Sequence, residues 1–297
     1  MKSKTLWVLF GVFFIFLCIG GMGFAGLWLI FSGGEDWPEP KGDIAIVEVK
    51  GAIFESAAIN EKLEKYRKND SVKAVVLRID SPGGSVGASQ EIYTEVKKLV
   101  QKKKVIVSMG AVAASGGYYI AAPATKIVAN PGTITGSIGV LMDHVEIEEL
   151  LKWAKVSAEI LKAGRDKDVG SSLRKMSPED RVILQGILDN MHEQFLQAVA
   201  EGRKIDLEEV RKIGTGRVYT GQQALDLKLI DQFGNFEDAI DVAAKEAGIK
   251  GEPTLIKPEK RKPMWIELLL GDEREEKISA LVHEVLTPKA LYWMSFR

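Results

Sequence analysis

The chain has 297 residues, and its 41 acidic and 40 basic side chains exclude the strongly basic surface that nucleic-acid-binding proteins need. A single cysteine, Cys18, excludes an internal disulfide framework and leaves no Cys/His cluster for zinc. Only three histidines are present, which limits any mechanism based on histidine. We therefore expect no nucleic-acid partner and no metal or other cofactor.

The first expected element is a membrane helix. Residues 6–31 carry no charge and exceed the ~20 residues that a transmembrane helix needs. Lysines lie in residues 1–5 and acidic residues follow in 32–42, so the positive-inside rule predicts a cytoplasmic N-terminus and an external remainder. The alternative is a signal peptide cleaved near Ala25, but the uncharged run is longer than the ~7–15-residue apolar core of such peptides.

After a short linker at residues 32–42, apolar runs alternate with amphipathic segments. Strands are expected at residues 44–49, 74–79, 105–107, 126–129, 138–141 and 158–161, and helices at 56–68, 85–102 and 146–155. This alternation predicts an α/β fold with βαβ units and a parallel sheet covered on both faces. Ligands of such sheets bind beyond the carboxyl ends of the strands, where two glycine pairs fall, at residues 83–84 and 116–117.

The second half of the chain is mainly helical. Ser177 as the cap and Pro178 at the first position predict a long helix that runs to about residue 202. Shorter helices are expected at residues 206–213, 221–227 and 236–247. Residues 43–250 then form one domain, and residues 251–297 a C-terminal appendage. Its aromatic tail is expected either to dock as a helix on the core or to contact a neighbouring subunit or the membrane surface.

The stretch at residues 110–117, Gly-Ala-Val-Ala-Ala-Ser-Gly-Gly, follows an apolar run and precedes another. Small neighbours let a ligand approach the hydroxyl of Ser115 closely. A serine at the start of a helix also lies beside free backbone N–H groups. This pattern is typical of a nucleophile in acyl transfer, while the alternative is a tight turn with Ser115 as a helix cap.

A serine nucleophile requires a base, and the histidine candidate is His144, which follows an expected strand. The other possibility is a lysine held neutral by burial. The charged loop after the last expected strand offers Lys162 and Lys167. The carboxylates of Asp166 and Asp168 favour a charged ammonium at Lys167, unless they point away from it as neighbours in an extended chain do.

Three motifs occur in order along the chain: Asp-Ser-Pro-Gly-Gly-Ser at residues 80–85, Ala-Ala-Ser-Gly-Gly-Tyr-Tyr at 113–119 and Thr-Ile-Thr-Gly-Ser-Ile-Gly-Val at 133–140. With them, the chain resembles the signal peptide peptidase A family over residues 44–248. That family comprises membrane-anchored bacterial serine proteases with the Clp-protease/crotonase-like fold. With one copy of this unit, the chain resembles a short family member.

The resemblance implies a Ser–Lys dyad. The Ala-Ser-Gly-Gly motif assigns the nucleophile to Ser115, and a motif of the form Gly-x-x-Lys-Asp assigns the general base to Lys167 rather than Lys162. Ser137 matches a serine that hydrogen-bonds this lysine. The resemblance also implies a ring-like homo-oligomer with active sites shared between neighbours, a location in the bacterial inner membrane, and substrates such as remnant signal peptides and poorly folded chains.

The oxyanion hole is expected from the backbone N–H groups of Gly83, Gly84 and Gly116. Asp80 is expected either to fix the turn after its strand or to touch substrate. Three other readings stay open: another membrane-bound serine protease of the same superfamily, a crotonase-type acyl-CoA enzyme that does not need Lys167, and a non-catalytic membrane scaffold.

Overall fold

The computed structural model describes residues 41–258 and 291–293. All of them belong to one compact unit, which begins at Lys41. The expected membrane segment at residues 6–31, most of the C-terminal appendage and His283 lie outside the described residues. No helix among the described residues combines the length and the apolar character needed to cross a bilayer.

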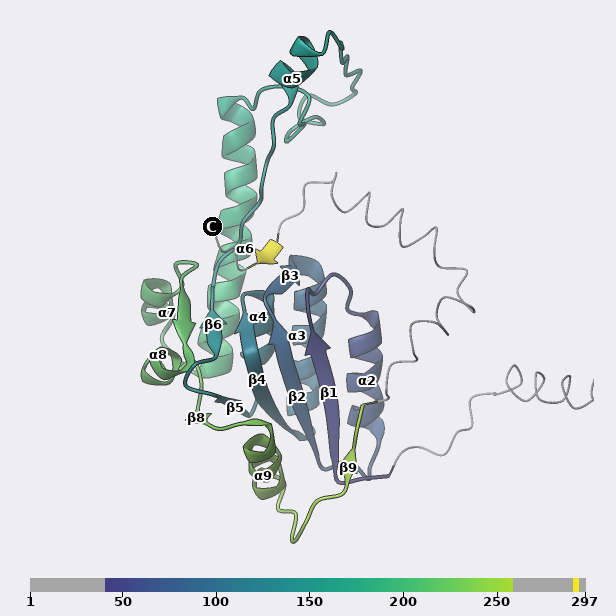
Figure 1. The fold of residues 1–297 in the computed structure, drawn as a ribbon, viewed down its shortest axis with the longest axis vertical. Coiled ribbons are helices and arrows are strands. Elements are labelled where there is room, and N and C mark those ends of the chain that lie inside the picture. The colour runs from purple at the N-terminus through teal and green to yellow at the C-terminus, as the bar shows by residue number, and fades with distance from the viewer. Residues whose placement is uncertain (1–40, 259–290, 294–297) are drawn as a thin grey trace, which may run out of the picture. The chain divides into compact units, whose positions relative to one another are not determined.

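A parallel sheet forms the centre of the domain (Figure 1). Strands β1 (Ile44–Lys50), β2 (Ala74–Ser81) and β4 (Lys104–Ala114) lie side by side in that order of pairing. Strand β5 (Lys126–Ala129) pairs with the first part of β4, and β6 (Ile134–Gly136) pairs with its end. Because β4 is long enough to serve both, it is the strand on which the rest of the sheet is assembled.

Three short strands extend this sheet. β8 (Gln232–Phe233) runs parallel to β5, and β9 (Leu255–Ile256) runs parallel to β1. β7 (Val218–Thr220) is antiparallel to β6. The expected α/β fold with a mainly parallel sheet is therefore confirmed.

Both faces of the sheet are covered, as expected. Ile46, Val76 and Ile106 lie on one face and pack against helix α9 (Phe236–Glu246). Their neighbours in sequence point to the opposite face, because side chains alternate along a strand. That face packs against the helices α2 (Ala57–Lys68), α3 (Val86–Val100), α4 (Gly116–Ala121) and α6 (Pro178–Arg203).

Two expected strands are wrong. The strand expected at residues 138–141 lies instead at Ile134–Gly136, because Ser137 has φ 52° and ends the extended chain. Residues 158–161 form no strand and are all exposed. Leu161 in this segment is 90% exposed, so its apolar character does not reflect a place in the core.

The helices of the second half agree with expectation to within a few residues: α5 (Glu148–Trp153), α6, α7 (Leu207–Ile213), α8 (Gly221–Asp226) and α9. The start of α6 is a capping box, in which Ser177 Oγ accepts from the Asp180 N–H (3.0 Å) and Asp180 Oδ2 accepts from the Ser177 N–H (3.1 Å). Residues 142–177, which we call the arm, connect β6 to this cap. Figure 1 shows that the arm, with α5, projects beyond the carboxyl ends of the central strands.

Candidate active site

Ser115 occupies the junction between β4 and α4 in a strained backbone conformation, with φ 53° and ψ −119°. A residue with a side chain rarely adopts this conformation, which costs of the order of 1–3 kcal/mol and persists only where the surroundings impose it. Two hydrogen bonds impose this conformation on Ser115. The Ser115 N–H donates to the Gly136 carbonyl (2.8 Å), and the Ser115 carbonyl accepts from the Tyr119 N–H (2.8 Å).

The hydroxyl of Ser115 is fully buried, and it has no hydrogen-bond partner among the described residues. A buried polar group without a partner costs about 1–3 kcal/mol. Ser115 is the N-cap residue of α4 by position, but its side chain makes no cap hydrogen bond to that helix. Backbone strain and an unpartnered hydroxyl thus coincide at one residue, as is typical of a functional site.

The three glycines expected to form an oxyanion hole lie together beside Ser115. A Cβ atom on Gly116 would lie 3.2 Å from the Gly84 nitrogen and 3.3 Å from the Gly83 Cα. The Gly83 N–H already donates to Ser81 Oγ (3.1 Å), and Gly84 lies opposite residue 292 in a strand pairing, so Gly84 becomes a free donor only when that strand leaves. The same Cβ would lie 2.5 Å from the hydroxyl of Ser89, a buried residue that sequence reasoning missed.

Ser137 and Asp80 flank this group. Ser137 follows Gly136, the residue that accepts the Ser115 N–H, and its side chain is buried. Asp80 Oδ1 accepts from the Val112 N–H (3.1 Å), where the pairing of β2 and β4 shifts register. Of the two expected roles for Asp80, the structure shows the first, which is to fix the turn after its strand.

The two candidate lysines lie on the arm. Lys167 is exposed, and its ammonium has no hydrogen bond or ion pair to any residue that the structure describes. Because the Ser115 hydroxyl has no partner either, the two side chains form no dyad within this one chain. Lys162 instead pairs with Asp168.

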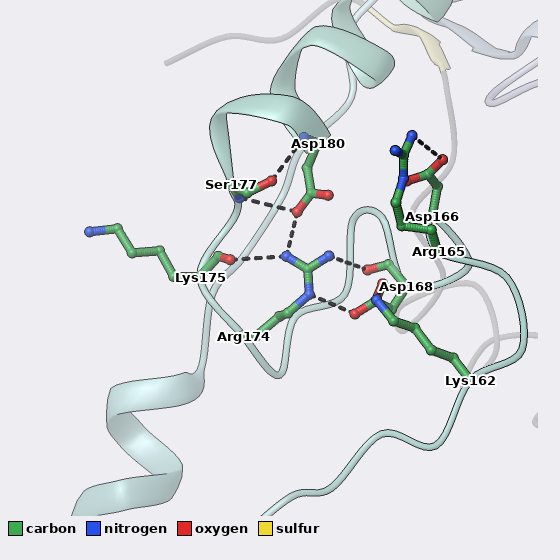
Figure 2. Close-up of polar contacts among 8 residues, drawn as sticks. All are labelled: Lys162, Arg165, Asp166, Asp168, Arg174, Lys175, Ser177 and Asp180. Atoms are coloured by element: carbon green, nitrogen blue, oxygen red, sulfur yellow. Dashed lines mark hydrogen bonds and ion pairs between the residues drawn. The ribbon is translucent and has the colours of Figure 1, made fainter.

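Figure 2 shows how the loop around Lys162 and Asp168 is held. The guanidinium of Arg174 donates to Asp168 Oδ2 through Nε (2.7 Å) and to the Asp168 carbonyl (3.2 Å). It also pairs with Asp180, the third residue of α6 and part of its capping box. Arg174 therefore fastens this loop to the start of α6, a role that the sequence did not reveal.

These ion pairs engage both acidic neighbours of Lys167. Arg174 first, and Lys162 second, hold the pKa of Asp168 well below its usual range. The hydrogen bond from Arg165 (2.9 Å) likewise lowers the pKa of Asp166. Both carboxylates are therefore paired with side chains other than Lys167.

The histidines offer no base to Ser115 among the described residues. His192 Nε2 lies 2.7 Å from the Gly214 carbonyl, so it links α6 to a turn rather than facing solvent as an ordinary surface residue. His144 lies on the arm, and its Nε2 atom is buried with no hydrogen-bond partner in the described part of the chain.

The aromatic tail forms a strand where the structure describes it. β10 (Leu291–Trp293) pairs antiparallel with β3 (Gly83–Ser85), with residue 292 opposite Gly84. The tail is thus not a docked helix at these residues. The edge of β3, next to the glycines beside Ser115, accepts an extended chain.

Comparison with known proteins identifies the family. A model of peptidase family S49 matches residues 97–250, and a Clp protease model matches residues 45–133. A Synechocystis sp. protein that carries a protease name is 40% identical over 266 residues, which are 88% of this chain and 95% of its own length. The chain belongs to peptidase family S49.

Two further relatives refine the assignment of this S49 peptidase. An Enterococcus faecium protein named as a signal peptide peptidase is 37% identical over 62% of this chain and 54% of its own length. Protease 4 of Salmonella typhi is 36% identical over 70% of this chain and 35% of its own length. The S49 peptidase is thus a serine-type peptidase of the signal peptide peptidase A type, and its mainly parallel sheet fits a Clp-protease-like fold.

The strain at Ser115 leads to a prediction about stability. Ser115→Gly removes the side chain from a backbone conformation that favours glycine, so we expect the free energy of unfolding to rise by about 1 kcal/mol. Ser115→Ala is the matched control, because it removes the hydroxyl but keeps the Cβ atom. Denaturant unfolding of both variants tests this, and equal stability of the two would contradict the strain.

The ion pairs of Arg174 lead to a second prediction. Arg174→Ala leaves the side chains of Asp168 and Asp180, which are 9% and 8% exposed, without their shared cation. Amide hydrogen exchange in residues 162–176 should therefore accelerate. Arg165→Ala is the control, because the pair of Arg165 with Asp166 is largely exposed, and such pairs contribute little.

This network also predicts a pH dependence. The pKa values of Asp168 and Asp180 are lowered in the folded arm. Their contribution to stability is complete above the ordinary aspartate pKa of ~3.9 and is lost as the pH falls through the lower folded values. Exchange rates in the arm, corrected for the intrinsic effect of pH, should stay level from neutral pH to about pH 5. Loss of protection in that range would contradict the ion pairing.

Proposed function

We propose that the S49 peptidase is an endopeptidase in which Ser115 is the nucleophile and Lys167 of a neighbouring subunit is the general base. One observation carries this proposal. The Ser115 hydroxyl is buried on a strained backbone beside glycine amides, with no base bonded to it among the residues that the structure describes, while Lys167 is exposed on the projecting arm.

The reaction follows from these groups. Ser115 Oγ attacks the carbonyl carbon of the peptide bond while Lys167 Nζ takes the hydroxyl proton. The N–H groups of Gly84 and Gly116 stabilise the negative oxygen that forms. The proton then passes from Lys167 to the leaving amine, and a water molecule activated by the same lysine hydrolyses the acyl-enzyme. Ser137 orients the lysine.

The surface of the arm supports sharing of the site between subunits. It exposes large apolar side chains: Val145 (68%), Leu150 (58%), Trp153 (82%), Val156 (53%) and Leu161 (90%). Exposed apolar patches of this kind mark protein–protein interfaces. Docking of the arm on another copy of the chain would bury Lys167, and burial favours its neutral amine.

The substrate we propose is an extended peptide with apolar side chains. The pairing of β10 with β3 supports an extended chain at that edge, next to Ser115, where a substrate strand would take the place of β10. A cavity of about 430 Å³ lies at the start of α3, lined by Val86, Ile183, Ile187 and Met191 together with polar residues. With residues 6–31 as a single-pass anchor and the domain outside the cytoplasm, remnant signal peptides fit this description.

Complementation between inactive variants tests the shared site. Ser115→Ala should lose peptidase activity and labelling by a fluorophosphonate, and Lys167→Ala should lose activity. When the two are mixed in equal amounts, about a quarter of the sites in a ring receive both wild-type residues, so activity should return to roughly that level. No recovery in oligomers shown by affinity tags to be mixed would place both residues in one chain.

Substitution of the base provides a further prediction. Lys167→Arg should be inactive, because a guanidinium stays protonated and cannot accept the serine proton. Lys162→Arg is the matched control and should stay active, since arginine also pairs with Asp168. The wild-type rate on a small peptide should rise with pH. If Lys167→Arg stays active while His144→Ala is inactive, the base is a histidine.

A further inference from the structure

A cavity of about 860 Å³ lies at the end of the sheet opposite to Ser115. It is lined by the residue before β2, by Lys104 at the start of β4, and by the ends of α3, α6 and α9, whereas Ser115 follows the other end of β4. Its lining includes seven cationic side chains: Lys73, Lys97, Lys102, Lys103, Lys104, Arg203 and Lys204. It includes three carboxylates: Glu201, Asp231 and Glu246.

The carboxylates do not neutralise the whole cluster. Each is already paired with one cation: Glu201 with Lys97 (2.6 Å), Asp231 with Arg203 (2.8 Å) and Glu246 with Lys126 (3.6 Å). Of the other cations, Lys73 pairs with Asp43 (2.7 Å) and Lys103 donates to the Tyr66 carbonyl (2.7 Å).

Three lysines remain: Lys102, Lys104 and Lys204. All three are exposed, and none has a hydrogen bond or ion pair to another residue in the part of the chain that the structure describes. Three free ammonium groups around one cavity repel each other, so their presence there favours an anionic ligand.

A simpler role for these lysines is to stabilise the ends of helices. α3, α6 and α9 all end at the cavity, and a helix C-terminus carries about half a negative charge. Three such ends supply roughly one and a half negative charges. The seven cations exceed the three carboxylates by four, so the helix ends leave a clear positive surplus.

We propose that this cavity binds a phosphate group. The three free ammonium groups offer rotatable point-charge donors, which suit phosphate oxygens. The group is carried either by the headgroup of an anionic phospholipid or by a soluble phosphate.

The position of the cavity favours the lipid. Asp43, which pairs with Lys73 at the cavity, is the third described residue, so the chain enters the domain at this edge. The linker at residues 32–42 spans at most about 40 Å from the proposed anchor. Basic clusters close to a membrane attract anionic lipids. The choice of a lipid as the ligand rests on the proposed membrane anchor. The phosphate site itself does not depend on that anchor.

Lysine footprinting of the full chain tests both parts. The acetylation rate of each lysine is measured by mass spectrometry in neutral detergent micelles with and without pyrophosphate. It is also measured in vesicles of phosphatidylcholine with and without phosphatidylglycerol. We expect pyrophosphate and phosphatidylglycerol each to slow Lys102, Lys104 and Lys204 several-fold, while Lys155, an exposed lysine on the arm, keeps its rate.

The outcomes distinguish a phospholipid headgroup from a soluble phosphate as the ligand. Protection by pyrophosphate alone supports the phosphate site and overturns the lipid source. Protection by neither overturns the proposal. Alkaline extraction of the chain from phosphatidylcholine vesicles reports the anchor independently, so a failed anchor is not mistaken for a failed site.

A matched pair of variants tests specificity. Lys204 and Lys155 both have φ 55°, where glycine is favoured, so both glycine variants should fold. Lys204→Gly should weaken the binding of pyrophosphate about fivefold, the usual effect of one lysine near an anionic group. Lys155→Gly, on the arm, should leave this binding unchanged. If both variants weakened pyrophosphate binding equally, the binding would depend on the general charge of the surface, and a defined site would be overturned.

Discussion

The backbone of Ser115 is the constraint on which the active site depends. Its positive φ turns the chain sharply from the central strand β4 into α4, and hydrogen bonds to Gly136 and Tyr119 hold that turn. The same turn brings Gly116 against the Gly83–Gly84 turn, so nucleophile and amide donors are positioned together. Because β4 pairs with β2, β5 and β6, the strain is supported by the whole sheet.

The proposed base, Lys167, lies on the arm and not on the central sheet that holds Ser115. Arg174 holds Asp168 and Asp180 together and thereby fixes the loop next to Lys167, while the apolar surface of the arm stays exposed. Lys167 is exposed in the single chain, whereas a lysine that acts as a general base is desolvated. Under the proposed mechanism, assembly therefore activates the enzyme, and an unassembled chain does not cleave peptides.

The alternation of apolar runs and helices was enough to predict the parallel sheet, and the glycine motifs predicted which turns meet at Ser115. The expected strand at 138–141 failed because a single positive φ at Ser137 ends β6, which no periodicity signals. The role of Arg174 was missed because it depends on contacts between loop and helix cap that arise only on folding. The pairing of β10 with β3 was missed for a similar reason, since it joins segments about two hundred residues apart.

The rate at which a fluorophosphonate labels Ser115, measured across protein concentrations that span oligomer assembly, tests this account most directly. We expect the rate to rise in proportion to the assembled fraction, and to stay low at every concentration in Lys167→Ala. A labelling rate that depends on Lys167 but is the same in the isolated chain and in the oligomer would contradict a base supplied by the neighbouring subunit.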